Sequence, residues 1–285
     1  MSEVLVSVLM TSYNREKYIA EAIESVLVSS YTNFELIIVD DCSNDNTVEI
    51  ARNYALKDSR IRLYVNEKNL DQFPNRNKAA SYAKGKYLKY CDSDDKLFDW
   101  TLDYCVQMME KYPKAGMGIL KLNKAIKEEY LLPRDAINKN FFEHSFLSIG
   151  PSGTILKREA FESIGLYNSE YGVPSDMYFN LKMAASFPIV LLDKVFFFYR
   201  EHDSQEIKNK YSYVCFNFKY LDDALNIPKF PLTVGQKNIV LKKAKRDFVI
   251  TFFIFLKDTG NLKKALKAYR ISGIGIVNFL KGIFQ

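Results

Sequence analysis

Four apolar runs divide the first hundred residues into segments of similar length. They cover residues 4–10, 34–39, 61–65 and 86–91, and the second run shows no alternation of apolar and polar positions. A run without alternation is typical of a strand that is covered on both faces. The runs have the spacing of β-α units, which predicts a mostly parallel sheet with right-handed crossovers.

Helices are predicted between these runs, where apolar residues recur every three or four positions. Asn14 is expected to cap the first helix, the second turns Val48 inward, and the third covers residues 75–84. The second half of the chain is less regular. It predicts strands at 154–158, 189–192 and 195–199, helices at 161–165 and 175–185, and helices beyond Pro231 that are interrupted near Gly260 and Gly273.

Polar residues follow three of the predicted strands. Residues 11–14 come after the first strand, Asp40 and Asp41 after the second, and residues 92–95 after the fourth. In open α/β sheets, ligands bind beyond the carboxyl ends of the strands. The three clusters are therefore expected to meet at one edge of the sheet.

The composition indicates a folded chain in a reducing compartment. Hydrophobic residues make up 48% and aromatic residues 14% of the 285 residues, which argues against disorder. The four cysteines are far apart and form no CxxC pair, as is typical of thiols in the cytoplasm. No signal peptide is visible, so a cytoplasmic location is expected.

Positive charge is concentrated in the last fifty residues. Residues 236–285 hold eleven Lys or Arg against two Asp, a net charge of +9, so the first 235 residues carry −3 of the total of +6. A basic tail indicates an anionic partner. No nucleic-acid-binding motif accompanies the charge, so we expect a membrane surface and no nucleic acid.

Two apolar stretches lie within this basic tail. Residues 248–256 and 271–284 are both shorter than the roughly 20 residues that span a bilayer. Interleaved with lysine and arginine, they predict amphipathic helices that lie in the interface of an anionic membrane. The alternative is that their apolar faces pack on the rest of the chain or on a second subunit.

Three carboxylates crowd the end of the fourth predicted strand. Asp92, Asp94 and Asp95 raise each other's pKa unless a cation lies among them. Such oxygens suit Mg²⁺ or Mn²⁺, and Mg²⁺ commonly binds one or two protein carboxylates together with phosphate oxygens. The alternative is a solvated loop in which Asp95 or Asp99 caps the next helix. The position beside two other polar strand ends favours the metal site.

Three segments, taken together at their spacing, resemble family-2 glycosyltransferases. They are residues 6–14, 35–47 and 90–95, and the resemblance covers about residues 4–203. These enzymes of the nucleotide-diphospho-sugar transferase superfamily have the GT-A fold and mostly invert the configuration at the sugar carbon. The resemblance implies an α/β fold with a mostly parallel, Rossmann-like sheet flanked by helices. It divides the chain into a catalytic domain at 1–205, with a nucleotide-binding half at about 1–97 and an acceptor half at about 98–205, and a helical, basic, amphipathic C-terminal extension at 206–285.

The resemblance assigns six residues to the donor nucleotide. They are Thr11, Tyr13, Asp41, Arg76, Asp92 and Ser93. Thr11 and Tyr13 match the loop that holds the nucleobase, and Asp41 matches a carboxylate that accepts a hydrogen bond from the base or ribose. Arg76 matches an arginine that approaches the nucleotide. Two alternatives stay open: Asp41 as a carboxylate at a helix N-terminus, and Arg76 as an exposed arginine, since the residues before it depart from the family's Gly-rich pattern.

The same resemblance implies a divalent cation, Mg²⁺ or Mn²⁺, and a catalytic base. Asp94, helped by Asp92, is expected to ligate the metal, and His202 in Tyr199-Arg200-Glu201-His202 is expected to ligate it or to touch the diphosphate. A structural role for His202 stays open. Asp176 matches the base, which takes the proton of the acceptor hydroxyl. Ser175 stands where the family has Glu, and an N-cap role for either residue is the alternative.

The chain is therefore expected to be an enzyme that moves a sugar from a nucleotide-diphosphate donor to an acceptor hydroxyl with inversion. A UDP-sugar is the favoured donor. The acceptor is expected to be a saccharide or a lipid-linked saccharide in bacterial cell-surface polysaccharide synthesis, with peripheral contact at the inner face of the cell membrane. Two other functions stay open. One is a glycan-binding or scaffolding module without turnover. The other is a sugar-phosphate nucleotidyltransferase, which usually has a Gly-rich loop where residues 11–15 have no glycine.

Overall fold

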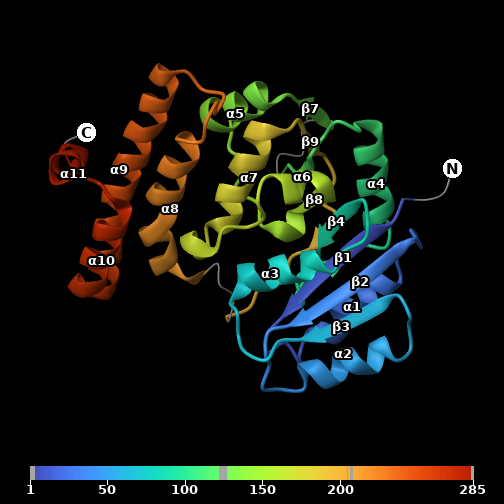
Figure 1. Ribbon diagram of the computed structural model, residues 1–285. Coiled ribbons are helices and arrows are strands. Elements are labelled where there is room, and N and C mark those ends of the chain that lie inside the picture. The colour runs from blue at the N-terminus through green and yellow to red at the C-terminus, as the bar shows by residue number, and fades with distance from the viewer. Residues whose placement is uncertain (1–3, 122–126, 204, 206–207, 284–285) are drawn as a thin grey trace.

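The computed structural model describes residues 4–121, 127–203, 205 and 208–283, and its centre is a twisted sheet (Figure 1). Within these residues the sheet has eight strands in the order β3-β2-β1-β4-β8-β6-β9-β7. Their bounds are β1 Val6–Ser12, β2 Phe34–Asp40, β3 Ile61–Val65, β4 Tyr87–Tyr90, β6 Met117–Leu120, β7 Glu129–Leu131, β8 Thr154–Lys157 and β9 Ile189–Leu192. A separate ribbon pairs β5 (Lys96–Leu97) with β10 (Phe197–Phe198).

The half of the sheet formed by β1 to β4 is parallel, as the β-α spacing predicts. β1 lies between β2 and β4, and β3 pairs with the outer side of β2. Beyond β4 the strand directions are mixed, because β8 runs antiparallel to both β4 and β6, and β7 runs antiparallel to β9. The α/β fold with a mostly parallel sheet is therefore confirmed.

Helices cover both faces of the sheet. One face is covered by α1 (Ile19–Leu27), α2 (Thr47–Ala55) and α4 (Thr101–Lys111), and the other by α3 (Gln72–Ser81), α5 (Pro133–Phe142), α6 (Arg158–Ser163), α7 (Ser175–Ser186) and α8 (Lys210–Leu225). Short 3₁₀ turns, η1 (Pro151–Gly153) and η2 (Ser169–Tyr171), lie before β8 and α7. The alternation along β1 explains the two layers: Val8 and Met10 face the first helix layer, and Leu9 faces the second.

The C-terminal helices gather at the end of the molecule farthest from β3 (Figure 1). They are α9 (Val234–Thr259), α10 (Leu262–Ser272) and α11 (Ile276–Ile283). Gly260 and Gly273 end α9 and α10 in the left-handed conformation, which glycine adopts at little cost. The predicted breaks at these glycines are confirmed. No helix within the described residues has both the length and the apolar character needed to cross a membrane.

The apolar stretches of the tail are partly buried and partly exposed. Phe248 and Phe252 pack with Phe218 of α8 in a separate hydrophobic core. In contrast, Phe253 and Ile254 remain about half exposed. The extension also joins the main core, because Val240 of α9 packs there. The division at residue 205 stays a prediction, and residues 204, 206 and 207 lie outside the described part.

Two local predictions are wrong. Asn14 does not cap α1, since it lies in a loop with a φ of 52°, and its side-chain oxygen accepts from the backbone N–H of Asn44. The strand predicted at 195–199 is reduced to β10, because the chain there only pairs with the short β5. Asn tolerates the left-handed conformation better than most residues, which explains its position in this loop.

Candidate active site

The polar ends of β1, β2 and β4 lie at one edge of the sheet. Ser12 is the register partner of Asp40, and Leu9 is the partner of Tyr90, so β4 ends beside the middle of β1. The Ser12 hydroxyl donates to the Asp40 carboxylate at 2.8 Å. Asp40 also accepts from the backbone N–H of Ser43, so it fixes the loop after β2. The three clusters that the sequence analysis singled out therefore converge.

Asp41 holds the loop after β3. Its carboxylate accepts from the Asn66 side chain at 2.7 Å and from the backbone N–H of Leu70 at 2.8 Å. It does not serve the N-terminus of α2, where the Thr47 N–H is accepted by Asp45. The helix-terminus alternative is therefore wrong. A donor contact for Asp41 stays a prediction.

The two residues assigned to the nucleobase lie at the end of β1 and in the loop that follows it. Tyr13 is 42% exposed, and Thr11, inside the end of β1, is partly buried. An exposed aromatic ring is a suitable surface for a planar base. The contact of Thr11 and Tyr13 with a donor stays a prediction.

Arg76 is buried and forms a salt bridge with Asp92. It leaves α3 with 7% of its surface exposed, so the exposed-arginine alternative is wrong. Burial works to raise the pKa of Asp92, but the charge and hydrogen bond of Arg76 outweigh it and lower that pKa. Asp92 is therefore a fixed anion whose carboxylate is already held by a cation.

Asp94 is the carboxylate shared by three segments. Its Oδ2 atom lies 3.0 Å from Arg15 Nε and 3.0 Å from His202 Nε2. Arg15 also donates to the carbonyl oxygens of Tyr13 and Asn14, at 3.1 Å each. The loop after β1, the end of β4 and the segment after β10 therefore meet at one carboxylate.

The remaining residues of this acidic segment turn inward. Ser93 and Asp95 are each 3% exposed. Burial, with the nearby charge of Asp92, raises the pKa of Asp95 to about 7, and its carboxylate accepts from the backbone N–H of Arg200. Neither Asp95 nor Asp99 caps α4, which has no side-chain cap, so the solvated-loop alternative is wrong. A donor contact for Ser93 stays a prediction.

His202 is held in place by aromatic and charged neighbours. Its ring stacks on Tyr18 with the centroids 5.0 Å apart, and its side chain is 9% exposed. Arg200 covers the Tyr18 ring and donates from Nε to the carbonyl oxygen of Asp94 at 3.0 Å. The imidazole therefore has a fixed direction toward Asp94. His144, in contrast, lies away from the site against Phe146.

Asp176 lies in the first turn of α7. A Cβ atom placed on Gly150 would lie 3.7 Å from its Oδ2, so the turn before β8 passes close to the carboxylate. Burial raises the pKa of Asp176 to about 7. The N-cap of α7 is Pro174, and neither Ser175 nor Asp176 supplies a side-chain cap, so that alternative is wrong. The Ser175 hydroxyl instead donates to the carbonyl of Gly172.

Two residues that the sequence analysis missed join Asp92 to the Asp176 side. The Ser152 hydroxyl accepts from the backbone N–H of Asp92 at 3.2 Å. Lys89 of β4 is fully buried, and its ammonium donates to the carbonyls of Tyr90 and Ser152. Burial lowers the pKa of Lys89. A lysine inside the apolar run Tyr87 to Cys91 is the signal that could have identified it.

The residues present fit a divalent cation that also binds phosphate. Asp94 and His202 offer a carboxylate oxygen and an imidazole nitrogen at one point, and both are ordinary Mn²⁺ ligands. No group of three His, Cys, Asp or Glu side chains converges within the described residues. A site for a phosphate-bound cation needs only one or two protein ligands, because phosphate oxygens and water complete its shell. Asp92, assigned as a second carboxylate ligand, is paired with Arg76, so its metal contact stays a prediction.

The family model described as "Glycosyl transferase family 2" matches residues 7–165, which is more than half of the chain. The chain belongs to glycosyl transferase family 2. The match runs from β1 to the end of α6 and so includes the segments that carry Asp41, Asp92 and Asp94. Asp176 and His202 lie beyond it.

Relatives in glycosyl transferase family 2 include two bacterial proteins. TuaG of Bacillus subtilis, named as a teichuronic acid biosynthesis glycosyltransferase, is 42% identical over 106 residues, 37% of this chain and 41% of TuaG. WfgD of Escherichia coli, named as a UDP-Glc:α-D-GlcNAc-diphosphoundecaprenol β-1,3-glucosyltransferase, is 40% identical over 111 residues, 39% of this chain and 43% of WfgD. The chain thus spans less than half the length of these curated relatives.

Solved structures of the same fold match almost the whole chain. Residues 1–349 of Staphylococcus aureus TarS, crystallised with UDP-GlcNAc, superpose with a TM-score of 0.74 at 18% identity, covering 98% of this chain and 81% of that one. The mannosyltransferase PcManGT of Pyrobaculum calidifontis, crystallised with GDP-Man and Mn²⁺, gives a TM-score of 0.64 at 17% identity, covering 98% and 83%. The GT-A fold is therefore confirmed, together with the helical C-terminal region.

Replacing Arg76 should destabilise the fold as well as the site. Arg76→Gln leaves Asp92 as a poorly compensated charge, and we expect a loss of about 2–3 kcal/mol in the free energy of unfolding at pH 7. Urea denaturation measures the change. Arg52→Gln is the matched control, because Arg52 forms an exposed ion pair with Glu49 and its loss should cost less than about 0.5 kcal/mol. Equal losses in the two variants would contradict the buried role of Arg76.

Proposed function

We propose that the chain transfers a sugar from a nucleotide-diphosphate donor to an acceptor hydroxyl with inversion, assisted by Mg²⁺ or Mn²⁺. The observation that carries this proposal is the shared carboxylate of Asp94, which faces His202 at the carboxyl end of β4. The nucleotide would lie over the loop after β1, with its base against Tyr13 and near Asp41. A UDP-sugar is the first donor to test, since TarS was crystallised with UDP-GlcNAc and WfgD is named for UDP-Glc.

In this proposal Asp94 and His202, helped by Asp92, hold the cation, which when bound neutralises the charge of the departing diphosphate. Arg15 and Arg200 hold the acidic segment in position through Asp94. The ion pair between the buried Arg76 and the partly exposed Asp92 would fix the end of β4 beneath the donor. These residues orient the leaving group and add no covalent step.

Asp176 is proposed as the base on the acceptor side. A carboxylate with a pKa near 7 is half ionised at neutral pH and still takes a proton effectively in the transition state. The acceptor oxygen would lose its proton to Asp176 as it attacks the anomeric carbon. Attack from the side opposite the diphosphate gives a single displacement and therefore inversion.

Cell-surface polysaccharide synthesis is the proposed setting. TuaG is named for teichuronic acid and WfgD for a lipid-linked acceptor, so a saccharide or a lipid-linked saccharide is the proposed acceptor. We also propose a cytoplasmic location with peripheral membrane contact through α9 to α11. The exposed apolar residues Phe253 and Ile254 support that contact.

Donor turnover tests the proposed function. The purified protein, incubated with a panel of nucleotide sugars, should release nucleoside diphosphate from at least one donor only when Mn²⁺ or Mg²⁺ is present. Release of a nucleoside diphosphate, and not of pyrophosphate from a nucleoside triphosphate, separates this activity from nucleotidyl transfer. A protein that binds glycans but releases no diphosphate with any donor would instead be a binding module.

A further inference from the structure

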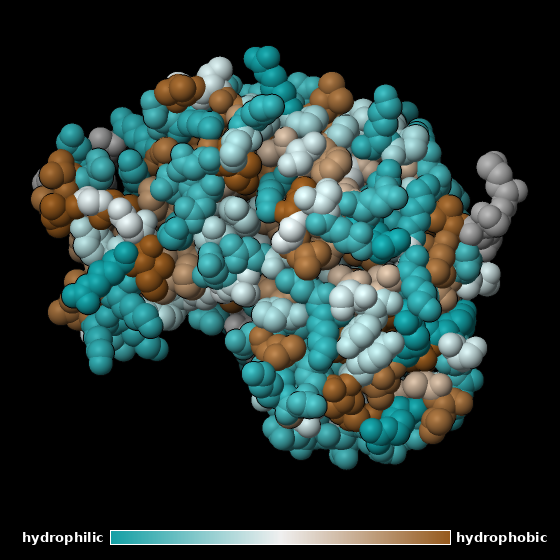
Figure 2. Space-filling model, viewed as in Figure 1, coloured by the Kyte–Doolittle hydropathy of each residue, from teal (hydrophilic) through white to brown (hydrophobic). Residues whose placement is uncertain are grey.

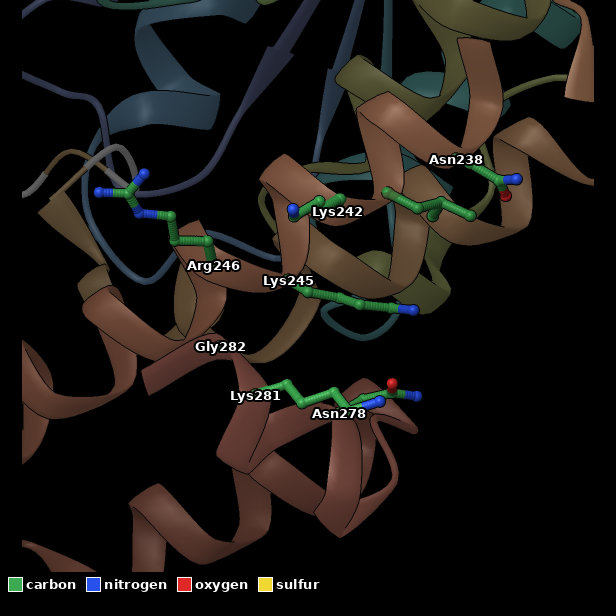
Figure 3. A pocket seen from close by; sticks show the side chains of 8 residues that line it. Asn238, Lys242, Lys245, Arg246, Asn278, Lys281 and Gly282 are labelled. Atoms are coloured by element: carbon green, nitrogen blue, oxygen red, sulfur yellow. The ribbon is translucent and has the colours of Figure 1, made fainter. Parts of the chain in front are cut away.

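A basic groove lies between α9 and α11, away from the proposed active site (Figure 3). Its volume is about 160 Å³, well above the roughly 10–15 Å³ that one water molecule needs. We call it the α9–α11 groove. Its lining residues are Asn238, Leu241, Lys242, Lys245, Arg246, Asn278, Lys281 and Gly282.

The groove carries positive charge without a matching acid. No carboxylate lines it, and within the described residues Lys242, Lys245 and Lys281 form no ion pair. Asp222 of α8 senses the charge of Lys245 but does not line the groove. Figure 3 shows Lys245 and Lys281 extending in the same direction from the two helices, whereas Arg246 points to the opposite side. Like charges along one groove repel one another, and an anion between them removes that cost.

The close contact of the two helices keeps the groove narrow. A Cβ atom placed on Gly282 would lie only 2.9 Å from Cγ2 of Val249, so α11 approaches α9 as closely as a glycine permits. The amide groups of Asn238 and Asn278 add neutral hydrogen-bond donors. Ammonium and amide donors around a narrow opening suit the oxygens of a phosphate group.

An exposed apolar surface borders the groove. On α11, Ile276, Val277 and Leu280 are 60%, 61% and 49% exposed, and Leu280 directly precedes Lys281. Phe253 of α9 lies against Phe279 of α11 and is itself 45% exposed. Figure 2 shows this hydrophobic surface over α11 at the left edge of the molecule. Apolar side chains next to lysines are the pattern of a helix that lies in a membrane interface.

We propose that the α9–α11 groove binds the phosphate of an anionic phospholipid headgroup while the apolar residues of α11 enter the acyl region. This inference does not depend on glycosyl transfer and gives the proposed membrane contact a defined binding site. Nucleic acid is disfavoured as the occupant, because bare aliphatic side chains such as Val277 and Leu280 gain nothing from a solvated phosphate backbone. A lipid supplies a partner for both the lysines and the apolar residues.

Vesicle sedimentation of the full chain tests the groove. The protein should sediment with vesicles of phosphatidylcholine in which about a third of the lipid is anionic phosphatidylglycerol. It should stay in solution with vesicles of phosphatidylcholine alone. Lys245→Gln combined with Lys281→Gln should weaken this binding by about fivefold for each charge removed, roughly 25-fold in all. Lys245→Arg combined with Lys281→Arg should restore it. Far-UV circular dichroism checks that each variant is folded.

A matched pair of lysines separates a defined groove from general attraction. Lys257→Gln combined with Lys263→Gln removes the same charge from exposed positions outside the groove and should weaken binding less than about fivefold. If the two double variants lose vesicle binding equally, the groove is not the binding site, although the membrane contact would stand. Absence of vesicle binding by the parent protein would overturn both. Tight binding of inorganic phosphate or of an oligonucleotide without vesicle binding, or a dimer that buries α11, would assign the surface to another partner and overturn the lipid.

Discussion

Asp176→Asn should lower the turnover of glycosyl transfer by about 10²–10⁴-fold while the donor still binds with unchanged affinity. The amide has nearly the shape of the carboxylate but does not take the proton of an acceptor hydroxyl. The parent enzyme should also gain activity as the pH rises through about 7, because burial raises the pKa of Asp176 to about 7 and only the ionised form is a base. Steady-state kinetics between pH 5.5 and 8.5, a range of about 1.5 units on either side of that pKa, measures both effects.

Unfolding of the variant is excluded by a stability control. A carboxyl group whose pKa is raised on folding stabilises the native state only at low pH, and this contribution is lost as the pH rises through the folded-state pKa of about 7. Asp176→Asn should therefore be at least as stable as the parent at pH 8. If the variant keeps its turnover and its pH profile, another residue is the base. If donor affinity falls together with turnover, Asp176 contacts the donor.

Asp94→Ala should abolish the dependence of donor binding on the metal, with a loss of at least about 100-fold in affinity for a nucleoside diphosphate in the presence of Mn²⁺. Removing a group that only orients a metal ligand already lowers metal affinity or activity by about 10–100-fold, so removing the ligand itself should lower metal affinity further. The change also leaves Arg15 and His202 without the carboxylate that they share. Calorimetric titration with UDP, with and without Mn²⁺, measures the effect.

The matched control for this prediction is Asp99→Ala. Asp99 lies in the same acidic stretch of sequence, but it is exposed and its carboxylate accepts only from the backbone N–H of Trp100 among the bonds described. The Asp99→Ala variant should bind UDP and Mn²⁺ with the affinity of the parent protein. If Asp94→Ala retains metal-dependent binding, the cation lies on other residues, and the shared carboxylate of Asp94 serves only to hold Arg15 and His202.

The parallel half of the fold could be predicted from the sequence because three of its strands, β1, β2 and β4, are almost entirely buried. The run at 34–39 is interrupted only by Glu35 and forms β2 except for its last residue, and the run at 61–65 forms β3. In such strands hydrophobicity alone marks the element. The antiparallel strand β7 is not predicted from the sequence, and β10 is shorter than the strand predicted at 195–199. Both are only two or three residues long and depend on partners far away in the chain.

The candidate site shows the same division between local and long-range information. The polar ends of β1, β2 and β4 were found because strand ends at a parallel edge are implied by local order. Arg15 could not be assigned, because its role depends on a carboxylate 79 positions away. The burial of Arg76 was also missed, since a single arginine on a helix gives no local sign of which face it occupies. Ser152 and Lys89 become connected only when β8 pairs with β4.

We propose that Asp94 and His202 hold a cation on a nucleoside diphosphate at the carboxyl end of β4. A crystal of the protein grown with UDP and Mn²⁺ tests this arrangement, because the anomalous signal of manganese identifies the ion and its position. We predict one manganese peak within bonding distance of Asp94 and His202, about 2.0–2.2 Å, with the diphosphate on its open side and uracil beside Tyr13. A manganese peak elsewhere, or UDP bound away from this edge, would contradict the claim.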